Sequence, residues 1–292
     1  MPEYVGRFAP SPTGPLHFGS LIAAVASYCD AKAAQGKWLV RIEDLDKPRE
    51  VIGAAQSILD TLVAYGFQWD GEIVYQSQQT ALYEHAFNQL KSKGLVYPCT
   101  CSRKEIADSS SQHGIEGAIY PGTCLKQALK PNAPIAWRVK TQCFVGEFKD
   151  VIQGKLSQDL SNEIGDFVIK RADGLFAYQL AVVVDDALQG VTHVVRGADL
   201  LLSTPRQIYL KRLLDLPDTS YAHVPVVKNA AGEKLSKQTL APALQTHDAK
   251  QQLLKALTFL NQSPPDTLGE ASLDDIWRWA ISNWQISRLN SI

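Results

Sequence analysis

The chain has 292 residues, of which 45% are hydrophobic, so it can bury a substantial core, and its length suggests about two domains. Its 29 Lys and Arg residues are balanced by 30 Asp and Glu residues, and the net charge of -1 excludes a protein whose overall positive field attracts nucleic acid or anionic membranes. A polyanionic partner must therefore be bound by a local patch of the surface.

No targeting or membrane segment is predicted. The N-terminus lacks the basic stretch and following apolar run of a signal peptide, and the longest apolar runs, such as 21–26 and 180–184, are too short to span a bilayer. Five Cys residues are too few for a disulfide framework. These features predict a soluble, cytoplasmic protein with no membrane partner.

The first hundred residues alternate strand and helix patterns. A strand is predicted over 4–8, and it leads into a Pro- and Gly-rich loop and an Ala-rich helix that ends near Gly36. A second strand is predicted over 38–42, followed by an acidic run and a helix over 51–65. This order of strands and helices predicts a parallel sheet that binds ligands at the carboxyl ends of its strands.

The middle of the chain has a different pattern. Short β-rich runs at 135–140, 144–148 and 167–170 are broken by Gly and Asp, which predicts an inserted α+β domain. The α/β pattern then returns with a strand at 192–195 and an amphipathic helix at 204–214. The parallel sheet is therefore expected to be completed from both sides of the insertion.

Two helices are predicted beyond Pro242. Ser272 can cap the second of them, and apolar residues recur at helical spacing after it. These apolar positions are Leu273, Ile276, Trp277, Ala280, Ile281 and Trp284. Packing against the rest of the protein, rather than chemistry, explains this pattern.

The loop over 10–20 joins the first predicted strand to the first helix. Free N–H groups and the dipole at a helix N-terminus favour phosphate, Gly14 and Gly19 allow close approach, and His17 adds a donor for developing charge. Pro- and Gly-rich turns also precede helices that bind nothing, and a lone His is more often structural. The pattern is therefore consistent with a nucleotide site without requiring one.

A second polar loop, 232–238, contains Lys234 and Lys237. Two Lys residues three positions apart can clamp a polyphosphate whose charge moves as pyrophosphate leaves. The same composition is typical of a solvated surface turn.

Four motifs in a fixed order resemble class I aminoacyl-tRNA synthetases. Residues 11–20 (SPTGPLHFGS) resemble the HIGH signature of that class, and 234–238 (KLSKQ) resemble its KMSKS signature. Residues 41–46 (RIEDLD) and the segment 182–206 resemble glutamyl-tRNA synthetases in particular. The resemblance covers residues 3–240.

Two features differ from an ordinary glutamyl-tRNA synthetase: no large C-terminal anticodon-binding region is expected, and a Cys-x-Cys and Tyr-x-x-x-Cys cluster is present in the insertion. This combination is similar to the glutamyl-queuosine tRNA(Asp) synthetases, a family of truncated paralogues. The resemblance implies ATP-dependent activation of L-glutamate to glutamyl-adenylate and transfer of glutamate to the queuosine base in the anticodon loop of tRNA(Asp). The alternatives are charging of a tRNA 3′ end, binding of glutamate or tRNA without turnover, and nucleotidyl transfer to another acid.

The resemblance also implies a fold and its division. We expect an α/β class I synthetase with a Rossmann-type parallel sheet, an inserted zinc-containing α+β domain and a short helical C-terminal region. The predicted parts are 1–98 and 189–225 for the catalytic domain, 99–188 for the inserted acceptor-type domain, and 226–292 for the KLSKQ loop and the helical region, with no anticodon-binding domain. A monomer is expected.

The glutamate site is implied by residues that match the family's positions. Glutamate carries two carboxylates and one ammonium, so its pocket needs Arg or other donors and one acid. The matching residues are Arg7, Ser11, Glu43, Tyr178 and Arg196. On physical grounds Glu43 is assigned to the ammonium, and Arg7 and Arg196 to the carboxylates in an order left open. A plain ion pair between Arg7 and Glu43, and a core role for Tyr178, are the alternatives.

ATP is expected to bind across the two signature loops. His17, Gly19 and Lys237 are the predicted ATP-binding residues, and His17, Lys234 and Lys237 are the predicted catalytic residues. The glutamate α-carboxylate would attack the α-phosphate of ATP, with Mg2+ bridging the phosphates, so catalysis depends on positioning and charge stabilisation.

A metal site is predicted in the insertion. Cys99, Cys101 and Cys124 supply three thiols, and Zn2+ prefers four tetrahedral ligands. The residues alone favour His113 as the fourth ligand, because phenolate is an uncommon zinc ligand, whereas the family positions imply Tyr120. We expect one structural Zn2+ per chain, and a cluster of reduced thiols without metal is the alternative.

Overall fold

The computed structural model describes residues 3–110, 112–114, 117–227 and 242–289. Its N-terminal third contains β1 (Val5–Phe8), α1 (Phe18–Ala33), β2 (Lys37–Ile42), α2 (Ala54–Ala64), β3 (Val74–Tyr75), α3 (Thr80–Ser92) and β4 (Val96–Cys99). The middle contains α4 (Arg103–Ser109), β5 (His113–Gly114), β6 (Gly117–Ala118), α5 (Thr123–Lys126), β7 (Ala136–Val139), β8 (Val145–Asp150), β9 (Gly154–Asp159), α6 (Leu160–Glu163) and β10 (Phe167–Lys170). The last third contains α7 (Tyr178–Leu188), β11 (His193–Gly197), α8 (Thr204–Leu213), β12 (Ser220–Val224), α9 (Ala249–Phe259) and α10 (Leu273–Asn283).

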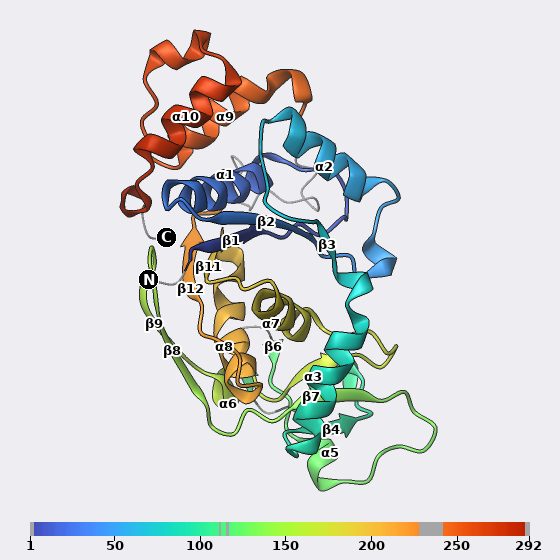
Figure 1. The fold of residues 1–292 in the computed structure, drawn as a ribbon. Helices are drawn as coiled ribbons and strands as arrows, with labels where there is room; N and C mark the ends of the chain where they lie inside the picture. Colours follow the sequence, from blue (N-terminus) through green and yellow to red (C-terminus); the bar gives the residue numbers. More distant parts are fainter. Residues whose placement is uncertain (1–2, 111, 115–116, 228–241, 290–292) are drawn as a thin grey trace.

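A parallel sheet forms the centre of the molecule, as predicted (Figure 1). β2 pairs with β1 and β3 in parallel, and β11 pairs with β12 in parallel. A backbone hydrogen bond joins these two groups of strands: the amide of Thr192, just before β11, donates to the carbonyl of Val5 in β1 at 3.0 Å. Strands from the two ends of the insertion therefore lie side by side, and their carboxyl ends share one edge of the sheet.

Helices cover both faces of this sheet. In Figure 1, α1 lies over one face and α7 and α8 lie against the other. The first core joins α1 and the sheet to α9 and α10, and it contains a cluster of rings from Tyr28, Trp38, Phe67 and Trp277. α1 is buried almost all round, which explains why its sequence is Ala-rich rather than strongly amphipathic. A helix packed this tightly on the sheet holds its N-terminus in a fixed place.

The predicted cap and apolar face of the last helix are confirmed. The hydroxyl of Ser272 accepts a hydrogen bond from the amide of Asp275 at 3.1 Å, and Ile276, Trp277 and Ala280 are buried. The indole of Trp277 donates to the carbonyl of Tyr65 at 2.8 Å. The C-terminal helices thus serve to cover α1 and the turn after α2.

A second core lies beneath the other face of the sheet. The antiparallel strands β10, β7 and β4 pack there with α3, α7 and α8. The hairpin of β8 and β9 belongs to the central sheet and not to this second core. Asp150 of β8 pairs with Tyr221 of β12, so the hairpin extends the sheet beyond β12. Part of the range 99–188 is therefore continuous with the central sheet, and the domain boundaries given above stay a prediction.

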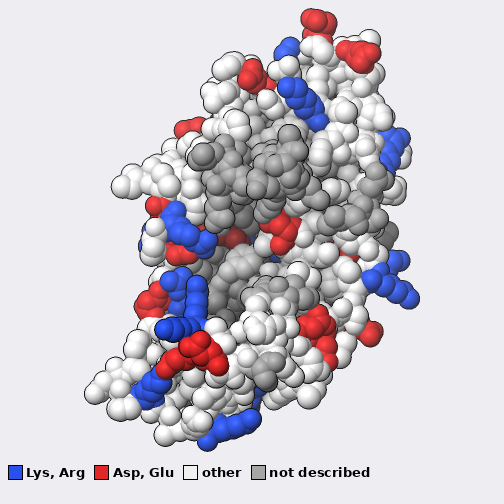
Figure 2. All heavy atoms as spheres, turned by 180° about the vertical axis from the view of Figure 1, so that it is seen from behind, with Lys and Arg blue, Asp and Glu red and all other residues white. Residues whose placement is uncertain are grey.

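Within the part of the chain that the structure describes, no helix combines the length and apolarity needed to cross a membrane. The reverse face of the molecule shows basic and acidic side chains interspersed, without one broad basic field (Figure 2). This distribution agrees with the near-zero net charge of the sequence.

Candidate active site

A pocket of about 790 Å3 opens at the carboxyl edge of the parallel sheet. Parallel strands bring their last residues to the same edge, and three of them end here. Arg7 lies near the end of β1, Glu43 follows β2, and Arg196 lies near the end of β11. Tyr178 begins α7, and Ser11, His17 and Gly19 come from the loop and first turn of α1.

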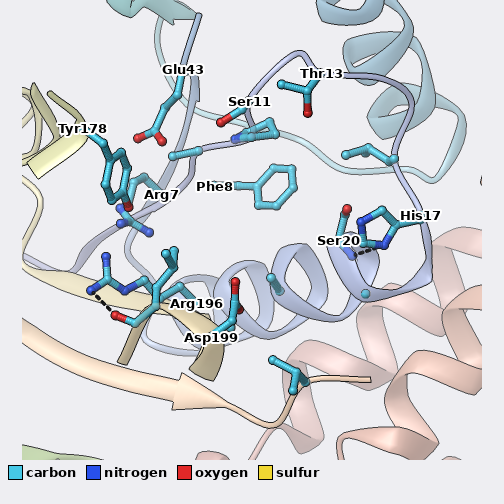
Figure 3. A pocket seen from close by; sticks show the side chains of 18 of the residues that line it. Arg7, Phe8, Ser11, Thr13, His17, Ser20, Glu43, Tyr178, Arg196 and Asp199 are labelled. Atoms are coloured by element: carbon cyan, nitrogen blue, oxygen red, sulfur yellow. Dashed lines mark hydrogen bonds between the residues drawn. The ribbon is translucent and has the colours of Figure 1, made fainter. Parts of the chain in front are cut away.

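All seven of these residues, which the sequence predicts for glutamate and ATP, line this one pocket. Figure 3 shows Arg7, Glu43, Tyr178 and Arg196 at one end of the pocket and His17 and Ser20 at the other, with Ser11 beside Glu43. The pocket therefore has two chemically different ends. One carries charged groups, and the other is formed by a polar loop at a helix N-terminus.

The charged end is supported by a buried ionic network. Arg41, which is fully buried in β2, donates to Asp186 at 2.8 Å and to Glu43 at 3.1 Å. Arg7 contacts Asp186 at 3.4 Å, so Arg7 and Glu43 each have a partner other than the simple pair considered from the sequence. Asp185 lies 3.7 Å from Arg41. Two guanidinium groups thus face three carboxylates, and the buried Lys211 ammonium also acts on Asp186.

The pKa shifts follow from this arrangement. Burial raises the pKa of the Glu43 carboxyl, and Arg41 and Arg7 oppose that effect only in part. Burial also acts on Asp186, but the nearby Arg7 and Arg41 outweigh it and lower its pKa to about 2. Burial also raises the pKa of Asp185, but of the three carboxylates Glu43 is the one that lines the pocket, so it is the one that a cation in the pocket can contact.

One donor of Arg196 has no partner among the described residues. Its Nε donates to Nε2 of His223 at 3.0 Å, and its Nη2 donates to the hydroxyl of Thr204 at 2.9 Å and to the carbonyl of Leu200 at 3.3 Å. Among the described residues, its buried Nη1 has no hydrogen-bond partner. Because a buried unpaired donor is costly, Arg196 can bind an anionic group in the pocket.

His17 caps α1 at the other end of the pocket. Its Nδ1 accepts a hydrogen bond from the amide of Ser20 at 3.3 Å, which favours the neutral tautomer with the proton on Nε2. The N–H on Nε2 is then a donor beside the free amides of the helix N-terminus. This end of the pocket can bind a phosphate.

The second signature loop falls on residues that are not described. Lys234 and Lys237 lie within 228–241, outside the described residues. The described residues on either side of it can be placed: Val227 lines the pocket, and Ala243 pairs with His17.

Sequence reasoning missed the groups that support the site. Asp185 and Asp186 follow three Val residues in α7, and Arg41 lies within the apolar strand β2. Charged residues inside apolar segments indicate buried ion pairs, because an unpaired buried charge is very unfavourable. That signal was present in the sequence, but it did not indicate which charges meet.

The three cysteines of the predicted metal site converge. The sulfur atoms of Cys99, Cys101 and Cys124 all lie within 4.8 Å of one another. The hydroxyl of Tyr120 lies 3.4 Å from the Cys99 sulfur and 3.7 Å from the Cys101 sulfur. His113 is exposed and lies outside this cluster, so the expectation from the residues alone, that it completes the set, is wrong.

The cluster has the size of a tetrahedral zinc site. With Zn–S bonds of about 2.3 Å, neighbouring sulfurs in a tetrahedron are about 3.8 Å apart, and the Cys101 and Cys124 sulfurs are 3.5 Å apart. Although burial opposes ionisation, the hydrogen bond from Tyr120 helps to lower the pKa of Cys124 to about 7. Arg138 donates to the Cys99 sulfur at 3.3 Å, and its guanidinium lies 4.0 Å from the centre of the Tyr120 ring. These donors and this cation suit an anionic metal site.

The chain is similar to a known family over most of its length. Residues 3–262 match the family of class I tRNA synthetases (E and Q), catalytic domain. The Glutamyl-Q tRNA(Asp) synthetase of Dechloromonas aromatica is 55% identical over 96% of this chain and 94% of its own length. The protein of the same name from Neisseria meningitidis serogroup B is 53% identical over 98% of this chain and 97% of its own.

A solved structure shares the fold. The glutamate tRNA ligase of Elizabethkingia meningosepticum, solved in complex with its amino acid, superposes with a TM-score of 0.80 at 23% identity. The match covers 99% of this chain and 66% of that longer chain. At this identity the likeness concerns the fold alone, and it agrees with the class I architecture predicted from the motifs.

Proposed function

Because the chain belongs to the glutamyl-Q tRNA(Asp) synthetases, within the class I synthetases for glutamate and glutamine, we propose that it activates L-glutamate with ATP and transfers the glutamyl group to queuosine in tRNA(Asp). The observation that carries this proposal is the charged end of the pocket. It combines Arg196, one donor of which has no partner among the described residues, with the buried carboxylate of Glu43, the pKa of which is raised by burial. Arg196 and Arg7 can bind the two carboxylates of glutamate, and Glu43 can bind its ammonium.

Glutamate would bind at the charged end of the pocket. Its ammonium would lie at Glu43, where a cation would offset the effect of burial on the carboxylate. Its two carboxylates would be bound by Arg7 and Arg196, with Ser11 and Tyr178 as further hydrogen-bonding groups. The hydroxyl of Tyr178 faces the pocket, which supports a binding role in place of a core role (Figure 3).

ATP would bind at the other end. The phosphates would lie at the N-terminus of α1, near Gly19, with the Nε2–H of His17 donating to the α-phosphate. Mg2+ bound with ATP would neutralise phosphate charge. Lys234 and Lys237 would contact the phosphates; this is supported by Val227, which lines the pocket, and by Ala243, which pairs with His17.

The first reaction would be an in-line displacement. A carboxylate oxygen of glutamate attacks the α-phosphorus, the bond from that phosphorus to the β-phosphate oxygen breaks, and pyrophosphate leaves with the bonding electrons. No protein nucleophile takes part, so the side chains act by holding the reacting groups and by stabilising charge. The glutamyl-adenylate would then lose AMP when the acceptor attacks the activated carbonyl carbon.

The group on the tRNA that accepts glutamate distinguishes this proposal from charging of the 3′ end. The alternative has the shared fold with a glutamate tRNA ligase behind it, and that likeness concerns the fold alone. If glutamate is joined to queuosine, tRNA(Asp) that contains queuosine but lacks its 3′-terminal CCA will still accept radiolabelled glutamate. Loss of all labelling on removal of CCA, with labelling of the intact tRNA retained, would instead establish the 3′ end as the acceptor.

We also propose that Cys99, Cys101, Tyr120 and Cys124 hold one structural Zn2+. The metal would replace the hydrogen bonds among these groups and join β4 to the turn around α5. None of the four residues lines the substrate pocket. The ion would therefore stabilise this part of the protein without entering the reaction.

Replacement of Cys101 by Ser tests the zinc proposal. The purified variant is expected to lose most of its zinc and to unfold at a lower temperature, because structural zinc contributes directly to folding free energy. Zinc content by atomic emission and thermal unfolding provide the measurements. Cys143→Ser is the matched control, because Cys143 is exposed and outside the cluster. A Cys101→Ser protein with a full equivalent of zinc and an unchanged Tm would refute the ligand set.

A further inference from the structure

His223 occupies a buried position between two charged residues. It lies on β12, between Asp150 at the end of β8 and Arg196 on β11, and both His223 and Asp150 are fully buried. Nδ1 of His223 lies 2.6 Å from Oδ2 of Asp150. Its Nε2 accepts from Nε of Arg196 at 3.0 Å. The three side chains form a continuous chain of hydrogen bonds that ends at the pocket.

Asp150 is held in one orientation. Its Oδ1 accepts hydrogen bonds from the backbone amides of Ile152 at 2.9 Å, Gln153 at 2.8 Å and His223 at 3.2 Å. Its Oδ2 therefore points at the imidazole. Burial acts against ionisation, but the hydrogen bonds outweigh it and hold the pKa of Asp150 below its usual range. An ionised carboxylate only accepts, so Nδ1 of His223 must carry the proton.

The environment keeps His223 neutral. Burial lowers its pKa, the charges of Arg196 and Arg7 act in the same direction, and the charge of Asp150 opposes them. The Thr204 hydroxyl lies 3.2 Å from Nε2, and the Tyr221 ring stacks at 6.2 Å. A neutral imidazole with its proton on Nδ1 has a lone pair on Nε2. That lone pair is the acceptor that faces Arg196.

We propose that Asp150 and His223 are positioning residues for substrate binding: Asp150 selects the tautomer of His223, and His223 holds the Arg196 guanidinium so that Nη1 faces a carboxylate of the substrate. The inference rests on the proposed function, because it takes glutamate as the ligand of Arg196. Neither residue lines the pocket, and both act through Arg196. The contacts from Nη2 to Thr204 and Leu200 constrain the other side of the guanidinium plane.

The Asp150→Asn variant tests the tautomer directly. An Asn side chain can keep its oxygen toward the three backbone amides, which places its NH2 group opposite Nδ1 of His223. The imidazole then has to accept at Nδ1 and carry its proton on Nε2, where it opposes the Nε–H of Arg196. The variant changes one atom of nearly equal size, so the effect on packing is small.

The expected result is a rise in the KM for glutamate on the order of tenfold to a hundredfold in ATP–pyrophosphate exchange, because a hydrogen bond to a charged group is lost. The KM for ATP is expected to stay unchanged. In 15N spectra of the histidine-labelled protein, the proton of His223 should move from Nδ1 to Nε2. The matched control is Asp159→Asn, on the other strand of the same hairpin. It should change neither the KM for glutamate nor the tautomer of His223, since Asn can also cap α6.

The inference is overturned if the tautomer of His223 switches in Asp150→Asn while the KM for glutamate stays unchanged. It is also overturned if the tautomer does not switch. If Asp150→Asn does not fold, His223→Gln is compared with His223→Phe, because only Gln offers Arg196 an oxygen acceptor. The KM for glutamate should be higher for Phe, and equal values would overturn the inference. Wild-type protein without glutamate-dependent exchange would instead contradict the proposed function.

Discussion

Replacement of Arg196 by Gln is expected to raise the KM for glutamate at least about thirtyfold, because truncating one member of a buried charged pair costs about 2 to 5 kcal/mol. Arg196 is buried, and its Nη1 is the donor left without a partner among the described residues that line the pocket. Gln retains a polar group but neither the charge nor the planar fork of donors. The KM for ATP should remain unchanged, since the two ends of the pocket are separate.

ATP–pyrophosphate exchange at varied glutamate and at varied ATP measures both constants. Arg278→Gln is the matched control, because Arg278 is exposed on α10 and pairs only with Asp275 among the described residues. Thermal unfolding of the two variants shows whether the fold is retained. A folded Arg196→Gln protein whose KM for glutamate equals that of the wild type would remove Arg196 from the binding site.

Replacement of Glu43 by Gln is expected to weaken glutamate binding by a similar factor and to change its pH dependence. The variant loses the carboxylate that would face the substrate ammonium, and the buried network around Arg41 loses its third negative charge. Burial raises the pKa of Glu43 in the wild type. As the pH falls through this raised pKa, the carboxylate becomes neutral, so the wild-type KM for glutamate should rise on the acidic side.

The Glu43→Gln variant cannot undergo this titration. Its KM for glutamate should be high at neutral pH and should increase less steeply toward acidic pH than that of the wild type. Glu84→Gln is the control, because Glu84 is paired with Lys170 outside the pocket. Parallel pH profiles for Glu43→Gln and the wild type would show that another group is responsible for binding the ammonium.

The sequence predicts the local elements of this fold well. Hydrophobic period, capping residues and Gly stops fixed α1, β2 and α10 to within a few residues, because these signals act between near neighbours. The β-rich run predicted at 144–148 was expected to belong to the insertion, yet the corresponding strand β8 pairs with β12, and β9 was not predicted. Which distant strands meet depends on the packing of the whole sheet, and no periodicity within a strand specifies it.

The site, like the fold, is predictable from the sequence only in part. The ends of parallel strands predicted that Arg7, Glu43 and Arg196 would meet, and the structure brings them to one pocket. The partners of these residues, among them Asp186 and His223, come from elements far away in the chain. The apolar neighbourhood of Asp186 indicates a buried ion pair, but which charged residue it meets becomes visible only in three dimensions.

The most direct test of the account is transfer of radiolabelled glutamate, with ATP and Mg2+, to two preparations of tRNA(Asp) that differ only at the wobble position, where one has queuosine and the other guanosine. The account predicts label on the queuosine form alone. Label on both forms of tRNA(Asp) would contradict it and would indicate ordinary 3′ aminoacylation. Label on tRNA(Glu) with none on either form of tRNA(Asp) would do the same.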